Sequence, residues 1–209
     1  MSTVVAIDGP AGAGKSTVAR MLAERMNYAY INTGSLYRAL SYAAITSGID
    51  FDQITPEFLS EQVLEFRGAD LYLNGKLMDA ELRRPECASG ASKVAANPAV
   101  RDYLLPVQRR AAENQWIVME GRDIGTGIFP DAEKKFFVTA SAEERARRRM
   151  NQGEAGSDFE TILAAIKERD ERDSNRAIAP LKQADDAILV DTTGMNIAEV
   201  VEHLAALCS

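Results

Sequence analysis

The stretch "GPAGAGKS", Gly9 to Ser16, matches the pattern GxxxxGK[ST] and joins two predicted elements of different kinds. It follows "TVVAID", Thr3 to Asp8, an apolar and β-branched run that is typical of a buried strand, and it precedes a run with apolar residues at helical spacing. In that context the glycines let backbone N–H groups turn toward a phosphate at a helix N-terminus, where Lys15 adds a positive charge. The stretch therefore predicts a phosphate-binding loop for a nucleoside triphosphate.

Magnesium ligands are expected beside this loop. The Ser16 hydroxyl is placed to ligate Mg²⁺, and the second element should be an acid at the end of another core strand. Glu120, after "WIVM", is the candidate and would reach the metal through water, although an ordinary strand-end carboxylate is the alternative. Guanine recognition is not expected, because the chain has no NKxD motif and its DxxG, at Asp191, follows the last predicted strand. The residues expected to contact the triphosphate are Gly9, Pro10, Ala11, Gly12, Ala13, Gly14, Lys15, Ser16 and Thr17.

The 209 residues carry a formal net charge of -7, which disfavours a broad nucleic-acid surface. No apolar run approaches the roughly 20 residues that cross a bilayer, and the first ten residues lack the basic and apolar regions of an export signal. Cys87 and Cys208 are far apart, and His203, the single histidine, has no partner in sequence, so none of the three is assigned a role. We expect a cytoplasmic monomer that binds small molecules, without nucleic-acid or membrane partners.

Strand-like and helix-like runs alternate along the chain, which predicts an α/β fold with a parallel sheet of about five strands flanked by helices. After the first strand, the predicted strands are Tyr28 to Ile31, Trp116 to Glu120, Lys134 to Ala140 and Ala187 to Asp191. The predicted helices are Ser16 to Met26, Ser35 to Thr46, Pro98 to about Glu113, Ser141 to near Gln152, and Ile197 to Leu207. Pro106 should kink or interrupt the helix that begins at Pro98.

Two segments depart from this alternation. Residues 49–97 contain short strand-like runs joined at Asn74-Gly75, a strong hairpin signal, and then a small helix, so we expect a compact antiparallel insert. The segment "NQGEAGSD", residues 151–158, is typical of a flexible joint. The remainder is expected to form one domain.

The most highly charged stretch, "IKERDERDSNRA", Ile166 to Ala177, lies in a run with helical periodicity. The residues recurring at intervals of three or four are Ile162, Ile166, Arg169, Asp173 and Arg176, with Arg172 beside them. A solvated outer face is the ordinary interpretation of such charge. However, this spacing continues an apolar stripe, and charge on an inward stripe needs an anionic partner. The arginines are therefore expected to face bound phosphate.

Six blocks of the chain look like the blocks of one family, in the same order. They are "IDGPAGAGKST", "NTGSLYRA", "ASKVAANPAVR", "EGRDIGTGIFPDA", "IKERDERDSNRAIAPL" and "DTTGMNIAEVV". From Val4 to the last helix, the chain resembles the bacterial cytidylate kinases, a branch of the nucleoside monophosphate kinases. The resemblance implies transfer of the γ-phosphate of ATP to CMP or dCMP with Mg²⁺ as cofactor. It also implies a single P-loop kinase domain, residues 1–209, in which residues 49–97 bind the nucleoside monophosphate and residues 153–180 form a helical LID.

The same resemblance implies a role for each matching residue. Thr33, Arg101 and Asp123 would face the cytosine, Arg38, Arg122 and Arg176 would hold the acceptor phosphate, and Ser92, Arg169 and Asp173 would contact the pentose. Arg172 would neutralise the transferring phosphoryl group, so that catalysis would rest on Lys15, Arg122, Arg172 and Arg176. Many relatives have glycine in place of Ser16 and aspartate in place of Glu120. An arginine of "ERARRRM" would stack on adenine, with Arg145, Arg147, Arg148 and Arg149 as alternatives.

Two rival functions remain open at this point. A P-loop kinase for another small acceptor, such as UMP or shikimate, would share Lys15 but would not need Asp123 together with Arg101. A nucleotide-gated binding module whose arginine helix docks an acidic partner would bind ATP without any turnover that an acceptor stimulates.

Overall fold

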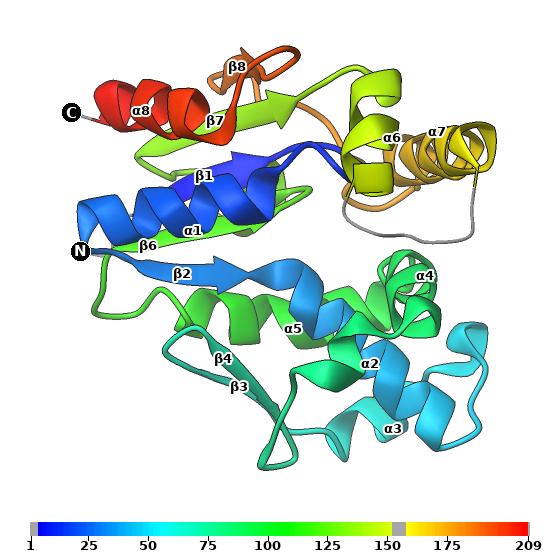
Figure 1. Ribbon diagram of the computed structural model, residues 1–209. Coiled ribbons are helices and arrows are strands. Elements are labelled where there is room, and N and C mark those ends of the chain that lie inside the picture. The colour runs from blue at the N-terminus through cyan, green and yellow to red at the C-terminus, as the bar shows by residue number, and fades with distance from the viewer. Residues whose placement is uncertain (1–3, 152–157, 209) are drawn as a thin grey trace.

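The computed structural model describes residues 4–151 and 158–208, and β1, Val4–Asp8, lies at the centre of its main sheet. Every residue of β1 is buried, as its apolar sequence predicts. The sheet has five parallel strands in the order β2-β6-β1-β7-β8 (Figure 1). The other strands are β2 (Ala29–Asn32), β6 (Ile117–Gly121), β7 (Lys134–Thr139) and β8 (Ile188–Asp191). The predicted fold class is thus confirmed.

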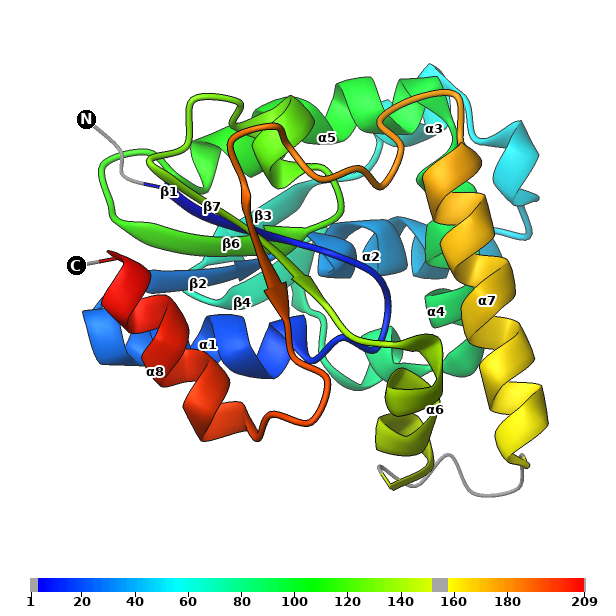
Figure 2. The ribbon, with the colours of Figure 1, turned by 90° about the horizontal axis from the view of Figure 1, so that it is seen from above.

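Helices cover both faces of this sheet (Figure 2). Because side chains alternate along a strand, Val5 and Ile7 pack in one core with α1 (Lys15–Met26) and α8 (Ile197–Cys208). Val4 and Ala6 pack in the opposite core, beside α5 (Pro98–Arg110). Pro106 does not interrupt the helix, since α5 continues through it, and the alternative of a kink at Pro106 stays a prediction. Loss of one backbone hydrogen bond is offset because Val100, Leu104 and Val107 bury one face of the helix.

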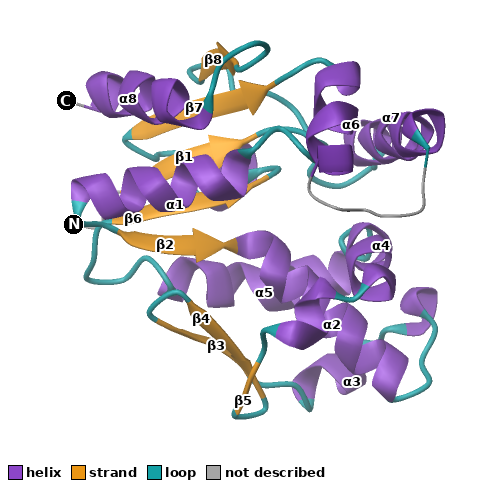
Figure 3. Cartoon of the chain, in the orientation of Figure 1, coloured by secondary structure: helices purple, strands orange, loops and turns teal. Residues whose placement is uncertain are grey.

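The segment between β2 and β6 forms a second core, which includes an antiparallel sheet (Figure 3). Its helices are α2 (Thr33–Thr46), α3 (Pro56–Ser60) and α4 (Pro85–Val94), with short 3-10 turns at Phe51–Gln53 and Ala80–Arg83. Its strands are β3 (Leu64–Arg67), β4 (Asp70–Leu73) and β5 (Lys76–Leu77). Asn74 and Gly75 both have positive φ, 52° and 78°, so the expected hairpin turn is present.

Two helices stand at the carboxyl end of the main sheet (Figures 1 and 2). They are α6 (Ala142–Asn151) and α7 (Phe159–Asn175), which share a small apolar core that contains Ala146, Ile162 and Ile166. Asp158 caps α7 by accepting a hydrogen bond from the Thr161 amide. The joint expected at residues 151–158 falls mainly on residues 152–157, outside the described residues. Across residues 4–151 and 158–208, no helix is long and apolar enough to cross a membrane.

Candidate active site

A cavity of about 790 Å³ opens at the carboxyl ends of β1, β2 and β6. Its walls come from the loop before α1, from α2 and α4, from the turn after β6, from α6 and α7, and from the segment that enters α8. The carboxyl edge of a parallel sheet is where ligands bind in α/β folds. The cavity is large enough for two small ligands side by side.

The glycine-rich loop forms one wall and has the backbone shape that phosphate binding requires. Gly9 has φ 146°, and a Cβ there would lie 1.9 Å from the Val138 carbonyl oxygen, so the tight approach to β7 excludes a side chain. Gly14 also has positive φ, 87°, at the start of α1. Residues 11–18 line the cavity, whereas Gly9 and Pro10 are not among the lining residues.

Lys15 is buried beneath this loop and donates a hydrogen bond of 2.7 Å to the Pro10 carbonyl. Burial lowers the pKa of Lys15 well below its ordinary value, and the positive charge of Arg122 adds to this effect. An anion in the cavity would raise the pKa of Lys15 and so oppose the effects of burial and of Arg122. Lys15 therefore lies where an added negative charge is electrostatically favoured.

The expected metal ligands lie near one tyrosine. Tyr30 of β2 donates a hydrogen bond of 2.7 Å to the buried Glu120 carboxylate, and the Asn32 amide donates to the Tyr30 oxygen at 3.4 Å. Burial, and then the charge of Glu120, raise the pKa of Tyr30, while hydrogen bonds from Asn32 and the neighbouring Ser16 oppose the rise. Tyr30 is a residue that sequence reasoning missed, because nothing in "YAYI" distinguishes it from a packing tyrosine.

Asp123, in the cavity wall, is paired with two arginines. Its Oδ2 accepts from Arg101 of α5, and its Oδ1 lies 3.4 Å from Nη2 of Arg176. Arg101 does not line the cavity itself, because it lies behind Asp123, with its guanidinium carbon 5.8 Å from the centre of the Tyr37 ring. Tyr37 does line the cavity and was also missed, although it directly precedes Arg38 in the "TGSLYR" block.

Thr33 and Arg38 extend this wall from α2. The Thr33 hydroxyl donates to the Glu120 carbonyl at 2.9 Å, which fixes its proton away from the cavity. Burial lowers the pKa of the Arg38 guanidinium, and Glu120 partly counters that effect. The structure thus brings Thr33, Arg38 and Asp123 to one cavity, as the sequence predicts.

Asp173 of α7 joins three elements. It accepts from the Ser92 hydroxyl of α4 at 2.9 Å and from Arg122 Nε, after β6, at 3.1 Å, and Arg169 Nε lies 4.0 Å away. Burial acts to raise the pKa of Asp173, but Arg122 and Arg169 outweigh it and hold the pKa below its ordinary value. Burial, and then the charge of Arg122, lower the pKa of Arg169 to about 10. Charged groups that lie at a cavity and shift one another's pKa are typical of functional sites.

The charged helix α7 turns one stripe toward the cavity, as its spacing predicts. Arg169, Asp173 and Arg176 line the cavity. Arg172 does not: its side chain is 38% exposed and pairs with Glu168 one turn earlier. The structure therefore brings Arg169 of α7 and Arg176, the residue after its last turn, to the cavity and leaves Arg172 partly exposed outside it.

The structure separates the roles of the four arginines of α6. Arg145 is buried and braces the phosphate loop, since it donates to the Ala11 and Ala140 carbonyls at 3.0 and 2.9 Å and to Asp170 of α7 at 2.6 Å. Arg147 is exposed and pairs with Glu144. Arg148 and Arg149 line the cavity. Of the four alternatives, Arg145 and Arg147 are thus poorly placed to contact a ligand.

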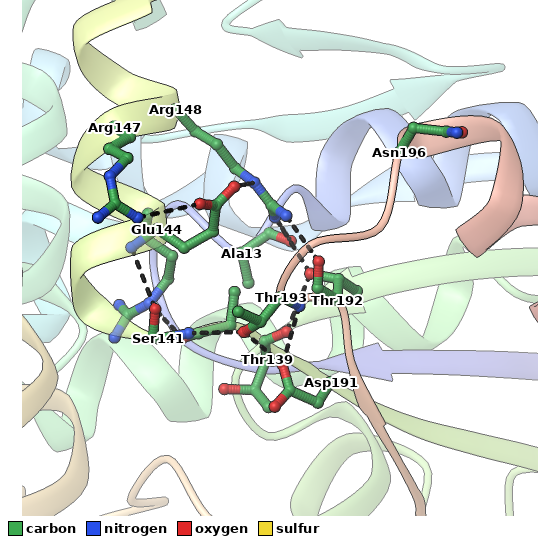
Figure 4. A network of polar contacts seen from close by, with 12 residues as sticks. Ala13, Thr139, Ser141, Glu144, Arg147, Arg148, Asp191, Thr192, Thr193 and Asn196 are labelled. Atoms are coloured by element: carbon green, nitrogen blue, oxygen red, sulfur yellow. Dashed lines mark hydrogen bonds and ion pairs between the residues drawn. The ribbon is translucent and has the colours of Figure 1, made fainter.

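Arg148 is held on two sides, as Figure 4 shows. Its Nε donates to the Glu144 carboxylate at 3.1 Å, and its terminal nitrogens donate to the hydroxyl and carbonyl of Thr192 at 3.1 and 2.8 Å. Met195, Ile197 and Val200 line the cavity on the same side, in or just before α8. A fixed guanidinium beside apolar side chains is suited to the flat face of a base.

Comparison with known proteins agrees with this geometry. The sequence model described as "Cytidylate kinase" matches residues 5–209. The cytidylate kinase of Pseudomonas aeruginosa is 47% identical over 216 residues, covering 98% of this chain and 94% of the relative, and that of Shouchella clausii is 48% identical, covering 97% and 94%. Among solved structures, an uncharacterized protein from Eubacterium ventriosum has a TM-score of 0.57 at 17% identity, over 99% of this chain and 98% of that one, which shows likeness of fold.

A phosphate-binding loop and a cluster of arginines on opposite walls of one cavity are the features of a P-loop kinase that acts on a small phosphorylated acceptor. The family model spans nearly the whole sequence, and so do relatives at close to half identity. The chain belongs to the cytidylate kinase family, and it is a nucleoside monophosphate kinase.

Proposed function

We propose that this cavity transfers the γ-phosphoryl group of ATP to CMP or dCMP, which gives ADP and CDP or dCDP. The observation that carries this proposal is the pair formed by Asp123 and Thr33, two oxygen acceptors in the wall that faces the phosphate loop. It explains the acceptor base, whereas the phosphate loop alone explains only the donor.

Cytosine fits these acceptors better than uracil does. The Thr33 proton is committed to the Glu120 carbonyl, so the hydroxyl oxygen can only accept from a ligand. Asp123 is likewise an acceptor when ionised. The exocyclic amine of cytosine offers two donors, but uracil has a carbonyl oxygen at that position and would set acceptor against acceptor. Arg101 orients Asp123, and its N–H groups would reach N3 and O2 of the base only if its side chain moves to line the cavity.

The acceptor phosphate would be held by Arg38, Arg122 and Arg176, and the pentose by Ser92, Arg169 and Asp173. The ion pairs of Arg122 with Asp173 and of Arg176 with Asp123 keep two of these arginines oriented toward the cavity. Lys15 would contact the transferring end of ATP. Phosphoryl transfer needs positioning and charge neutralisation rather than a general base, which agrees with His203 being exposed and not among the residues that line the cavity.

Mg²⁺ fits the residues beside the loop. Ser16 and Glu120 both line the cavity with oxygen atoms, the ligands that Mg²⁺ prefers. In the part of the chain that the structure describes, no cluster of three or more His, Cys, Asp or Glu residues could hold a metal, and phosphate oxygens and water would complete the coordination of the ion. Ser16 would hold the ion directly and Glu120 through water, and the ion would neutralise charge on the β- and γ-phosphates.

The surrounding segments complete the proposal. Residues 49–97 would bind the monophosphate within a single kinase domain of residues 1–209. Residues 153–180, of which 153–157 lie outside the described residues, would act as a LID that excludes water. Arg148 or Arg149 would contact adenine, and Arg172 would reach the transferring phosphoryl group when the LID closes. We also propose a cytoplasmic monomer without nucleic-acid partners, supported by two free cysteines and a net charge of -7.

A panel of acceptors tests this function. ADP release with MgATP is measured for CMP, dCMP, UMP, AMP and shikimate, and we expect CMP and dCMP to be turned over fastest. Equal or faster turnover of UMP or AMP would contradict the assignment of Asp123 and Thr33. ATP binding without stimulation by any acceptor would instead favour the nucleotide-gated binding module.

A further inference from the structure

Asp8 is a buried carboxylate that the scheme above does not use. It is the last residue of β1, 5% exposed, and it is not among the residues that line the cavity. Its Oδ1 accepts from the Ile124 amide at 2.8 Å, and its Oδ2 accepts from the Gly125 amide at 2.8 Å. Asp8 therefore holds backbone rather than ligand.

The backbone that Asp8 holds is the turn after the acceptor-recognition residues. Ile124–Ile128 forms a single π-helical turn, closed by bonds from Ile128 to the Asp123 carbonyl at 3.2 Å and from Phe129 to the Ile124 carbonyl at 2.7 Å. The first amides of a helical turn have no partner within it, and Asp8 supplies one for two of them. Arg122 and Asp123 directly precede these amides, so the direction of their side chains depends on this anchored backbone.

The same residue begins the phosphate loop. Asp8 pairs in register with Gly121 of β6 and is followed by Gly9, whose backbone passes too close to Val138 for any side chain. A Cβ on Gly125 would lie 3.5 Å from Asp8 Oδ2 and 3.1 Å from Lys135 Cδ, so the turn has little room to shift. The donor loop and the acceptor turn thus meet at one carboxylate.

The charged groups that face Asp8 are Asp123, which raises its pKa, and Lys15 of α1, which lowers it. Lys135 of β7 packs its methylene groups nearby but turns its ammonium to Asp186. Burial is the largest influence and raises the pKa of Asp8 to about 6, against the two amide hydrogen bonds. Because the folded-state pKa is raised, the ionised group makes the fold less stable above pH 6 than below it. A buried carboxylate whose ionised form lowers the stability of the fold is typical of a residue with a function.

We infer that Asp8 is a positioning residue for acceptor recognition: by holding the amides of Ile124 and Gly125, its carboxylate aims Arg122 and Asp123 at the nucleoside monophosphate and ties their turn to the phosphate loop. This inference rests on the proposed function, since it assigns Asp8 to the acceptor half of that site. An ionised carboxylate can accept both amide hydrogens. A protonated acid or an asparagine amide directs a donor at one of them.

Asp8→Asn tests the inference, with Asp131→Asn as the matched control at an exposed site in the loop before β7. In Asp8→Asn the KM for CMP should rise about tenfold or more at pH 7.5, while the KM for ATP stays within about threefold, because the lost acceptor lies under the acceptor turn. Asp131→Asn should match the wild type. An unchanged KM for CMP in a folded Asp8→Asn protein would overturn the inference.

A second measurement needs no variant and therefore does not depend on Asp8→Asn folding. In ¹⁵N-labelled wild-type protein without nucleotide, the amide protons of Ile124 and Gly125 should move upfield together as the pH falls through about 6. Amides of Ile124 and Gly125 that show no titration at any pH at which the protein stays folded would contradict the role of the ionised carboxylate. If the wild type turns over neither CMP nor dCMP, the proposed function fails. If it turns over CMP while Asp8→Asn behaves identically, only this inference fails.

Discussion

Arg122 Nε lies 3.1 Å from Asp173 Oδ2, and this ion pair joins the turn after β6 to helix α7 across the cavity. The Ser92 hydroxyl completes the contact from α4. Three segments that are separate in sequence are therefore held by one carboxylate at the opening where the acceptor is expected to bind.

Replacing Asp173 with Asn should lower stability by about 1–3 kcal/mol, because Arg122 and Arg169 would lose their counter-charge in a partly buried site. The folded-state pKa of Asp173 is lowered, so its contribution is present above the unfolded-state pKa near 4 and is lost as pH falls through the folded value. Thermal unfolding of both proteins across pH 3 to 8 measures this. The difference in Tm should be constant from pH 8 to 5 and shrink below pH 4, and a decline that begins near pH 6 would contradict the ion pair.

Asp123→Asn should shift acceptor preference from CMP toward UMP. The amide can donate to the uracil O4, and it opposes the amine of cytosine when its nitrogen faces the ligand. The ratio of kcat/KM for CMP to that for UMP should fall by about tenfold or more, the range expected for one reversed hydrogen-bond pair. Binding of ATP, measured by calorimetry, should stay near that of the wild type. If ATP binding is lost as well, Asp123 has a structural role.

Arg172→Ala should lower kcat about tenfold or more with a smaller change in either KM, because we propose that Arg172 leaves Glu168 and meets the transferring phosphoryl group only in the closed state. Lys167→Ala is the matched control, since Lys167 is an exposed cation on the same helix and pairs only with Glu143 at 3.5 Å among the ion pairs of the described residues. Equal kcat values for the two variants and the wild type would show that Arg172 is a solvated surface residue without a role in phosphoryl transfer.

Arg148→Ala should raise the KM for ATP about tenfold and leave the KM for CMP nearly unchanged, because the fixed guanidinium lies on the donor side of the cavity beside α8. Arg147→Ala removes the same side chain one position earlier, where it is exposed and pairs with Glu144. Steady-state kinetics of the pair separates ligand contact from general charge. A similar rise in both variants would mean that net charge on α6, not contact, is responsible.

Tyr30→Phe should raise the Mg²⁺ concentration needed for half-maximal activity by several-fold to about tenfold, because Glu120 would lose the hydrogen bond that orients it. Mn²⁺ binding to the protein with ADP, followed by electron paramagnetic resonance, gives an independent readout. Tyr28→Phe is the control, since Tyr28 lies in the same segment but its ring packs at a tilt against that of Trp116. Unaltered metal binding in Tyr30→Phe would show that Glu120 does not depend on Tyr30.

The sequence predicts the phosphate loop and the sheet because their signals are local. The loop pattern occupies eight consecutive residues, and β1 is recognisable from its own apolar run. The inward stripe of α7 is likewise read from spacing within one helix. The Asn74-Gly75 turn follows from the backbone freedom of those two residue types.

The parts that sequence reasoning leaves open depend on contacts between distant segments. Helical spacing cannot distinguish Arg145 from Arg148, since residues three apart on α6 share one side of the helix. The partners that separate them, Ala11 and Asp170 for one and Thr192 for the other, come from other elements. The position of Arg101 beside Asp123 similarly depends on how α5 packs against the turn after β6.

Arg145 of α6 connects helix α7 to the phosphate loop. One guanidinium is shared by the Ala11 carbonyl in the phosphate loop, the Ala140 carbonyl after β7 and the Asp170 carboxylate on α7. If α7 swings away from the cavity, either its bond to Arg145 breaks or α6 moves with it and pulls on the phosphate loop. If α6 and α7 moved together about a hinge before α6, one motion would change both the access of solvent to the acceptor and the shape of the loop that binds the donor phosphates.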